Sequence, residues 1–167
     1  MLKNKYTIYA LVLFLGGAIQ TSIAADVDSR DRAEIEALMW HYVRALDTFN
    51  SDAYAETFTE DGQFIAGENT VTGHEALKNM IDNYRRDRED RTARGEKVPP
   101  LNHIMTNEYL EFIDKDHARL HSYWMTVFGA TGPEGPPSVA ASGRGIDELV
   151  RVNGRWLIKL RNVTPDE

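Results

Sequence analysis

Cysteine is absent from all 167 residues of the chain. Its absence excludes a disulfide framework, a lipid-modified cysteine and a metal site built on thiolates. The fold must therefore be held by a hydrophobic core alone, and a chain of this length is long enough to bury one.

Basic residues are also scarce, with 19 Lys and Arg against 26 Asp and Glu and a formal net charge of −7. A surface this acidic repels the phosphate backbone of nucleic acids, so we expect no nucleic-acid partner. Removal of the first 24 residues, which we predict below, takes away two more lysines and makes the balance more acidic.

Long apolar runs are confined to the N-terminus. Two lysines stand in MLKNKY (1–6), the apolar stretch TIYALVLFLGGAI (7–19) follows, and QTSIAAD (20–26) is rich in small residues. This order predicts a secretory signal peptide over residues 1–24, cleaved after Ala24. An uncleaved anchor helix is the less favoured alternative, because the run is shorter than the ~20 residues that span a bilayer.

We predict that residues 25–167 form a single domain with no membrane attachment after cleavage. Export without cysteine is more typical of the bacterial periplasm than of an extracellular module stabilised by disulfides. We therefore expect a secreted or periplasmic protein.

The first half of this domain has the pattern of amphipathic helices. Residues 30–50 place apolar side chains at i, i+3, i+4, i+7, i+8 and i+11, one stripe of a helix. Residues 53–58 suit a short second helix, 60–62 (Glu-Asp-Gly) a turn and 63–67 a short strand, and a third helix begins near residue 72. The stripe residues of the first helix are Ile35, Leu38, Met39, Tyr42, Val43 and Leu46.

The third helix runs into a segment of mixed charge, RRDREDRTARGEK (85–97). Interspersed charges are typical of a solvated helix end and loop. A substrate lid is the less favoured interpretation of this segment.

Beyond Pro99 and Pro100 the apolar pattern changes from helical to alternating. Alternation predicts strands over 102–113, 117–128, 139–152 and 155–163, and Asn153-Gly154 between the last two is a strong hairpin signal. Helices followed by an antiparallel sheet built from hairpins indicate an α+β domain. A strongly bent sheet wrapped around the helices would leave a cone-shaped cavity, and ligand pockets favour such concave sites.

One histidine stands in the first of these strands. Alternation places His103 on the same face as Met105 and Tyr109, so it would line the cone if that face points inward. A lone histidine there is more often a hydrogen-bonded core residue than a catalyst. The remaining histidines show no metal-ligand spacing, so we predict no metal site; they are His41, His74, His117 and His121.

Asp47 lies one turn after Val43, at the edge of the apolar stripe and near the end of the first helix. A carboxylate there is partly desolvated and stands at the negative end of the helix dipole, so a cationic partner would stabilise it. His103 or an arginine could be that partner. Otherwise Asp47 turns outward to water or bonds the local backbone.

Two further polar residues are candidates for the cavity. Tyr42 lies inside the stripe, and its hydroxyl either reaches the cone or packs in the core. Arg161, in the last strand, shares a face with Leu157, Lys159 and Val163, and alternation does not decide whether that face is the inner one. A charge on the edge of a final strand is the simpler interpretation.

Several segments together resemble SnoaL-like domains, within the nuclear transport factor 2-like superfamily. The resemblance covers residues 30–164, is carried by the order and spacing of the segments, and implies a cone of bent antiparallel sheet against three helices. The segments are DRAEIEALMWHYVRALDTFNSDAYAETFTEDGQF, TGHEAL, NHIMTNEYLEF, HARLHSYWMTV and DELVRVNGRWLIKLRNV.

Some enzymes of that superfamily, including scytalone dehydratase, lindane dehydrochlorinase and the bile-acid dehydratase, use an Asp–His pair inside the cone. The resemblance assigns this pair to Asp47 and His103, a pocket arginine to Arg161 and a pocket tyrosine to Tyr42. It implies a cofactor-independent lyase or isomerase in which Asp47 fixes the tautomer of His103, and His103 removes a proton from a carbon of a small, mostly apolar substrate. Arg161 or Tyr42 would then stabilise the leaving group or an enolate.

Two other functions stay open. An exported binding module would hold a small hydrophobic ligand without turnover, and an oligomerisation domain would fill its cone with side chains and assemble through its sheet. Relatives commonly form dimers or trimers, so the resemblance also implies a homo-oligomer.

Overall fold

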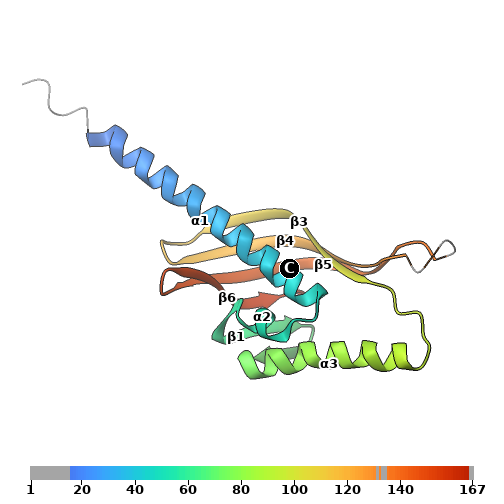
Figure 1. Ribbon diagram of the computed structural model, residues 1–167. Coiled ribbons are helices and arrows are strands. Elements are labelled where there is room, and N and C mark those ends of the chain that lie inside the picture. Colours follow the sequence, from blue (N-terminus) through green and yellow to red (C-terminus); the bar gives the residue numbers. More distant parts are fainter. Residues whose placement is uncertain (1–15, 131, 133–134, 166–167) are drawn as a thin grey trace, which may run out of the picture.

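The computed structural model describes residues 16–130, 132 and 135–165, with side chains from residue 28 onward. Helices and one sheet make up this part of the chain (Figure 1). The helices are α1 (Gly16–Asp47), α2 (Ser51–Ala55) and α3 (His74–Ala93). The strands are β1 (Phe58–Ala66), β2 (Asn69–Thr72), β3 (Leu101–Phe112), β4 (His117–Phe128), β5 (Ser138–Val152) and β6 (Arg155–Asn162).

The sheet confirms the predicted α+β class. Its strand order is β2-β1-β6-β5-β4-β3, and it is open, with β2 and β3 at its edges. The strands from β3 to β6 pair antiparallel in sequence order, each within one residue of its predicted bounds. The helical half of the chain joins the sheet through β1, which pairs parallel with β6.

The predicted turn at residues 60–62 is wrong. These residues lie inside β1, where the pairing with β6 shifts register between Phe58 and Gln63. Gly62 is packed so closely at this irregularity that a Cβ there would lie 2.8 Å from the Phe58 Cβ. The turn signal therefore marks a bulge within a strand. Strand β2 was not predicted, because its sequence Asn-Thr-Val-Thr is short and mostly polar.

The first helix ends before residue 50, earlier than predicted. Phe49 has a left-handed backbone (φ 52°), and Asn50 caps α2 by accepting a hydrogen bond from the Ala53 N–H at 3.1 Å. The left-handed residue ends α1, and the cap begins α2 directly after it. Asp47 is consequently the last residue of α1.

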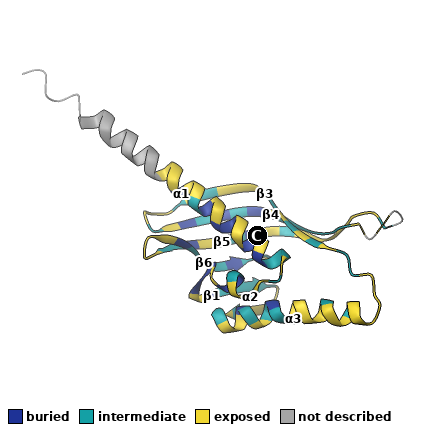
Figure 2. Ribbon diagram, viewed as in Figure 1, coloured by how far each residue is buried: buried dark blue, intermediate teal, exposed yellow. Residues whose placement is uncertain are grey.

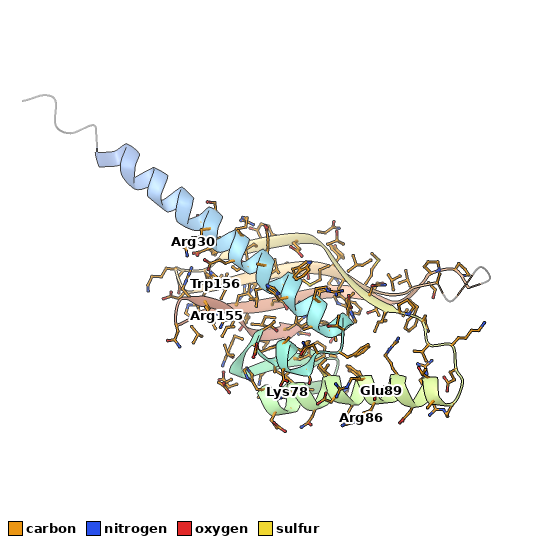
Figure 3. The ribbon with its side chains drawn as sticks, viewed as in Figure 1. Arg30, Lys78, Arg86, Glu89, Arg155 and Trp156 are labelled. Atoms are coloured by element: carbon orange, nitrogen blue, oxygen red, sulfur yellow. The ribbon has the colours of Figure 1, made fainter. Side chains whose placement is uncertain are left out.

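The core lies between α1 and the sheet, which α1 crosses in Figure 1. Most of the predicted stripe of α1 is buried, as the dark blue segments of Figure 2 show, whereas Val43 and Leu46 remain partly exposed. Helix α3 carries mainly exposed residues over its second half, and its labelled side chains in Figure 3 include Lys78 and Arg86. The segment 85–97 is thus largely solvated, although Arg88 and Arg91 are partly buried.

The predicted signal peptide lies mostly outside the described residues, and its cleavage stays a prediction. Within the part of the chain that is described, no helix has the length and apolar character needed to cross a membrane.

Candidate active site

His103 lies on β3, where the C-terminal end of α1 meets the edge of the sheet. An edge strand leaves alternate backbone N–H groups without a strand partner. The His103 backbone N–H donates to Asp47 Oδ1 at 2.9 Å, and the same oxygen lies 2.7 Å from His103 Nδ1. Asp47 therefore fixes both the strand and the imidazole that the strand carries.

The Asp47 contact also sets the proton distribution on the ring. An ionised carboxylate only accepts hydrogen bonds, so Nδ1 carries the proton and Nε2 is the basic nitrogen. The Asp47 side chain is 10% exposed and that of His103 is 22% exposed, so the carboxylate is shielded while the imidazole remains accessible. This arrangement suits proton transfer at Nε2.

Arg161 and Asp147 form a buried ion pair beside this dyad. Arg161 Nη1 lies 2.5 Å from Asp147 Oδ2, and the two side chains are 3% and 0% exposed. The guanidinium carbon stands 4.6 Å from the centre of the Tyr42 ring, and Nη2 donates to Met105 Sδ at 3.5 Å. A thioether is a weak acceptor, so this N–H can bond a better one when a ligand supplies it.

Burial and charge set the protonation of these groups. Burial raises the pKa of the Asp147 carboxyl, which the Arg161 charge opposes. Burial disfavours the Arg161 cation, but the Asp147 carboxylate together with Tyr42 and Tyr54 outweighs this, so the pKa of the arginine lies above its ordinary value. Burial also raises the pKa of the Tyr42 hydroxyl. Arg161 therefore stays charged, and Tyr42 stays neutral, throughout the neutral range.

Arg161 does not share a face with Leu157 and Lys159, contrary to the alternation in the sequence. The pairing of β6 with β5 shifts by one residue at Lys159. Ile158, before the shift, and Arg161, after it, are both buried on the core side. A bulge of one residue has moved the arginine to the inner face.

A similar irregularity separates Tyr109 from His103. The pairing of β3 with β4 shifts between Thr106 and Tyr109, where Asn107 has a φ of 51°. Met105 lines the cavity with His103, but Tyr109 is 65% exposed on the other face of the sheet. The prediction that all three residues share one face is wrong for Tyr109.

His103, Arg161 and Tyr42 line one inner cavity of about 160 Å³, and Asp47 stands behind His103. The walls are mostly apolar and come from α1, β1, β3, β4 and β6 with the residue that follows it. The other lining residues are Val43, Leu46, Phe64, Met105, Trp124, Thr126 and Val163.

A second, outer cavity of about 320 Å³ adjoins the inner one. The two share Leu46, Phe64 and His103, so the imidazole stands between them. The other lining residues of the outer cavity are Phe49, Tyr54, Met80, Tyr84, Asp87, Arg88, Arg91, Leu101 and Phe128.

The other histidines lie elsewhere. His41 is exposed on α1, and His74 Nε2 contacts the Phe58 carbonyl at 3.0 Å. His117 contacts the Asp114 carboxylate on the surface. No three His, Asp or Glu side chains of the described residues are grouped so that they could hold a metal ion.

Two residues of the site were missed in the sequence. Asp147 is a carboxylate on a strand face that also carries Leu149, and that position alone could have drawn attention to it. Trp124 lies over Gly143, and its Nε1 donates to the Arg144 and Val163 carbonyls, each at 3.0 Å. The sequence gives no signal for Trp124, because its position depends on its packing against Gly143 of the next strand.

Comparison with known proteins agrees with the fold. A family model described as a SnoaL-like domain matches residues 27–162. No curated protein sequence matches the chain.

Solved structures with the same fold are numerous. A Novosphingobium aromaticivorans protein described as a candidate scytalone dehydratase is 24% identical, with a TM-score of 0.65 over 83% of this chain and 85% of that one. An NTF2-like protein with a cystatin-like fold from the same organism is 20% identical, with a TM-score of 0.69 over 85% and 86%. A Catenulispora acidiphila protein, solved in complex with S-DNPA, is 24% identical, with a TM-score of 0.64 over 80% and 91%. At these identities the likeness shows the fold alone.

Proposed function

The chain belongs to the SnoaL-like domain family, and from that premise we propose that it is a cofactor-independent lyase or isomerase of the dehydratase type. The observation that carries the proposal is the 2.7 Å contact between Asp47 Oδ1 and His103 Nδ1 at the wall of a mostly apolar cavity. A buried carboxylate that orients a histidine is the arrangement that makes Nε2 a general base.

The proposed reaction begins with proton abstraction from carbon. His103 Nε2 takes a proton from a carbon next to a carbonyl, and Asp47 stabilises the imidazolium that forms. The electron pair left on the carbon forms a double bond as hydroxide leaves the adjacent carbon. The imidazolium returns its proton to the hydroxide, so the products are an enone and water. In an isomerisation the same proton returns to a different carbon.

Arg161 and Tyr42 would donate hydrogen bonds to the carbonyl oxygen of the substrate. Charge develops on the carbonyl oxygen as the proton leaves, and positioned donors in a dry site stabilise it. Arg161 Nη2 donates to the weak acceptor Met105 Sδ, so a substrate oxygen that enters the inner cavity can replace the thioether as its acceptor. The Tyr42 hydroxyl can donate because burial raises its pKa and keeps it protonated.

The proposal is tested with ring-sized β-hydroxy ketones, for example 3-hydroxycyclohexanone, by following formation of the enone and exchange of the acidic proton in D₂O by NMR. We expect His103→Ala to lower the rate by at least ~10², the usual size of a general-base contribution. Asp47→Asn should lower it as well, because the amide no longer selects the tautomer.

His41→Ala is the matched control, since His41 is exposed on α1 away from both cavities, and it should leave the rate unchanged. Full activity of His103→Ala would refute the proposal. Tight binding with neither exchange nor elimination would favour the alternative of a non-catalytic binding module.

A further inference from the structure

The inner cavity admits only a small fragment of a substrate. Its volume is about 160 Å³. A cavity of about 150 Å³ holds a single benzene ring, whereas pockets for larger ligands measure roughly 300–1,000 Å³. A substrate with more than one ring must extend past His103, and the outer cavity is the space that it would enter.

Arg88 stands on the rim of the outer cavity in a fixed position. Its guanidinium carbon lies 5.3 Å from the centre of the Phe49 ring, and its Nη2 donates to the Pro99 carbonyl at 2.8 Å. None of the ion pairs found among the described residues includes Arg88. An arginine carries five N–H donors, so most of those on Arg88 remain for a ligand.

The other arginine on this rim is already compensated. Arg91 Nε lies 2.8 Å from Glu96 Oε2. The Glu96 carboxylate, with a smaller contribution from Asp87, raises the pKa of Arg91. Arg88 is therefore the rim cation whose charge is left for a ligand.

The backbone conformation of Phe49 also indicates a ligand site at the outer cavity. A left-handed residue at the end of a helix is usually glycine, because side chains disfavour that conformation. Here a phenylalanine adopts it, with φ 52°, and its ring lines the outer cavity beneath Arg88. Disfavoured backbone conformations gather where ligands bind.

We propose that the outer cavity is a second substrate subsite, which takes the anionic end of an amphipathic molecule. The apolar body of that molecule packs on Phe49, its carboxylate, sulfonate or phosphate group bonds Arg88, and its ring-sized reacting end enters the inner cavity. The role of the reacting end rests on the proposed function, but binding at the outer subsite does not require turnover.

The test compares two fluorescent probes of nearly the same shape. 1-Anilinonaphthalene-8-sulfonate carries an anionic group, and N-phenyl-1-naphthylamine is its neutral counterpart. Dissociation constants are measured by fluorescence titration for the full chain and for Arg88→Met, Phe49→Ala and Arg86→Met. Arg86 lies on the same helix (Figure 3) and lines neither cavity, so Arg86→Met is the matched control for loss of charge.

We expect Arg88→Met to weaken binding of the sulfonate about fivefold, as for a partly exposed ion pair, and to leave the neutral probe unchanged. Phe49→Ala should weaken both probes, and Arg86→Met should affect neither. Equal losses for both probes in Arg88→Met, equal effects of Arg88→Met and Arg86→Met, or no effect of Phe49→Ala would each overturn the proposal.

Repeating the titration in the His103→Ala background separates this inference from the proposed function. If the subsite exists, the dependence on Arg88 persists in a protein that no longer turns over substrate. If the dependence on Arg88 is absent while the full chain remains active, the subsite is refuted and the catalytic proposal stands.

Discussion

The pairing of Arg161 with Asp147 supplies the site with a cation whose side chain is almost fully buried. Removing one member of such a pair leaves the other charge buried without a partner, which typically lowers stability by about 3–5 kcal/mol. We predict a loss of this size in the free energy of unfolding for Asp147→Ala, measured by urea denaturation. A loss below about 1 kcal/mol would contradict the ion pair as described.

The same pair allows stability and activity to be separated. Apolar side chains of similar volume often replace a buried ion pair at little cost in stability. The double variant Asp147→Leu with Arg161→Met should therefore recover most of the stability lost in Asp147→Ala. Its activity should stay low, because no cation would remain beside His103. Recovered activity in this double variant would remove Arg161 from the proposed mechanism.

A site residue could be predicted when its own helix or strand alone fixes its position. It could not when its position also depends on the pairing with a neighbouring strand. Asp47 was identified from its position on one helix, and the histidine proposed as its partner lies 2.7 Å away. Arg161 needed an additional step, because the bulge at Lys159 changes which face it occupies. Asp147 was missed, because the same bulge is what places Arg161 opposite it on β6. A register counted from Asn153-Gly154 pairs Asp147 with residue 160 and leaves Arg161 on the opposite face.

At the scale of elements, the close packing of β4 on β5 shapes the inner cavity. Gly143 lies opposite Trp124, and a Cβ at this glycine would come within 2.7 Å of Trp124 Cζ2. We predict that Gly143→Ala displaces the indole and breaks its hydrogen bonds to the Arg144 and Val163 carbonyls. The inner cavity would change shape, because Trp124 forms part of its wall.

The displacement is detected by a change in tryptophan fluorescence that is absent in a Trp124→Phe background. Turnover or probe binding should fall by at least about tenfold, a typical consequence of misplacing groups around a reacting centre. Ala141→Ser, at an exposed position of the same strand, is the control and should leave both signals unchanged. An unchanged indole signal in Gly143→Ala would contradict the prediction, because it would show that strand β5 moves and the Trp124 ring keeps its position.

Strand bounds were predictable because alternation and the Asn-Gly turn act locally. The bulges in β1, β3 and β6 were not predictable, since each depends on the pairing with a neighbouring strand. These irregularities have direct consequences for the site. One of them turns Tyr109 out of the cavity wall, and another brings Arg161 into it.

For the whole molecule, the informative feature is the outer face of β3 and β4, which no helix covers in the described part of the chain. Ile104, Tyr109 and Tyr123 are 41%, 65% and 50% exposed on this face. The register places Tyr109 opposite His121, two residues from Tyr123 on the same side of β4, so these side chains form one patch. Exposed apolar patches of this kind commonly mark protein interfaces.

We propose that this patch joins copies of the chain into a homo-oligomer. Placing a charge at its centre should disfavour association, because an unpaired charge would be desolvated in the interface. Light scattering coupled to size-exclusion chromatography should give a multiple of the chain mass for the unmodified protein and a single chain mass for Tyr123→Arg. Trp40→Arg is the matched control, because Trp40 is an aromatic residue of similar exposure on α1, and it should leave the mass unchanged. A monomeric unmodified protein would refute the oligomer, and dissociation by Trp40→Arg alone would place the interface on α1.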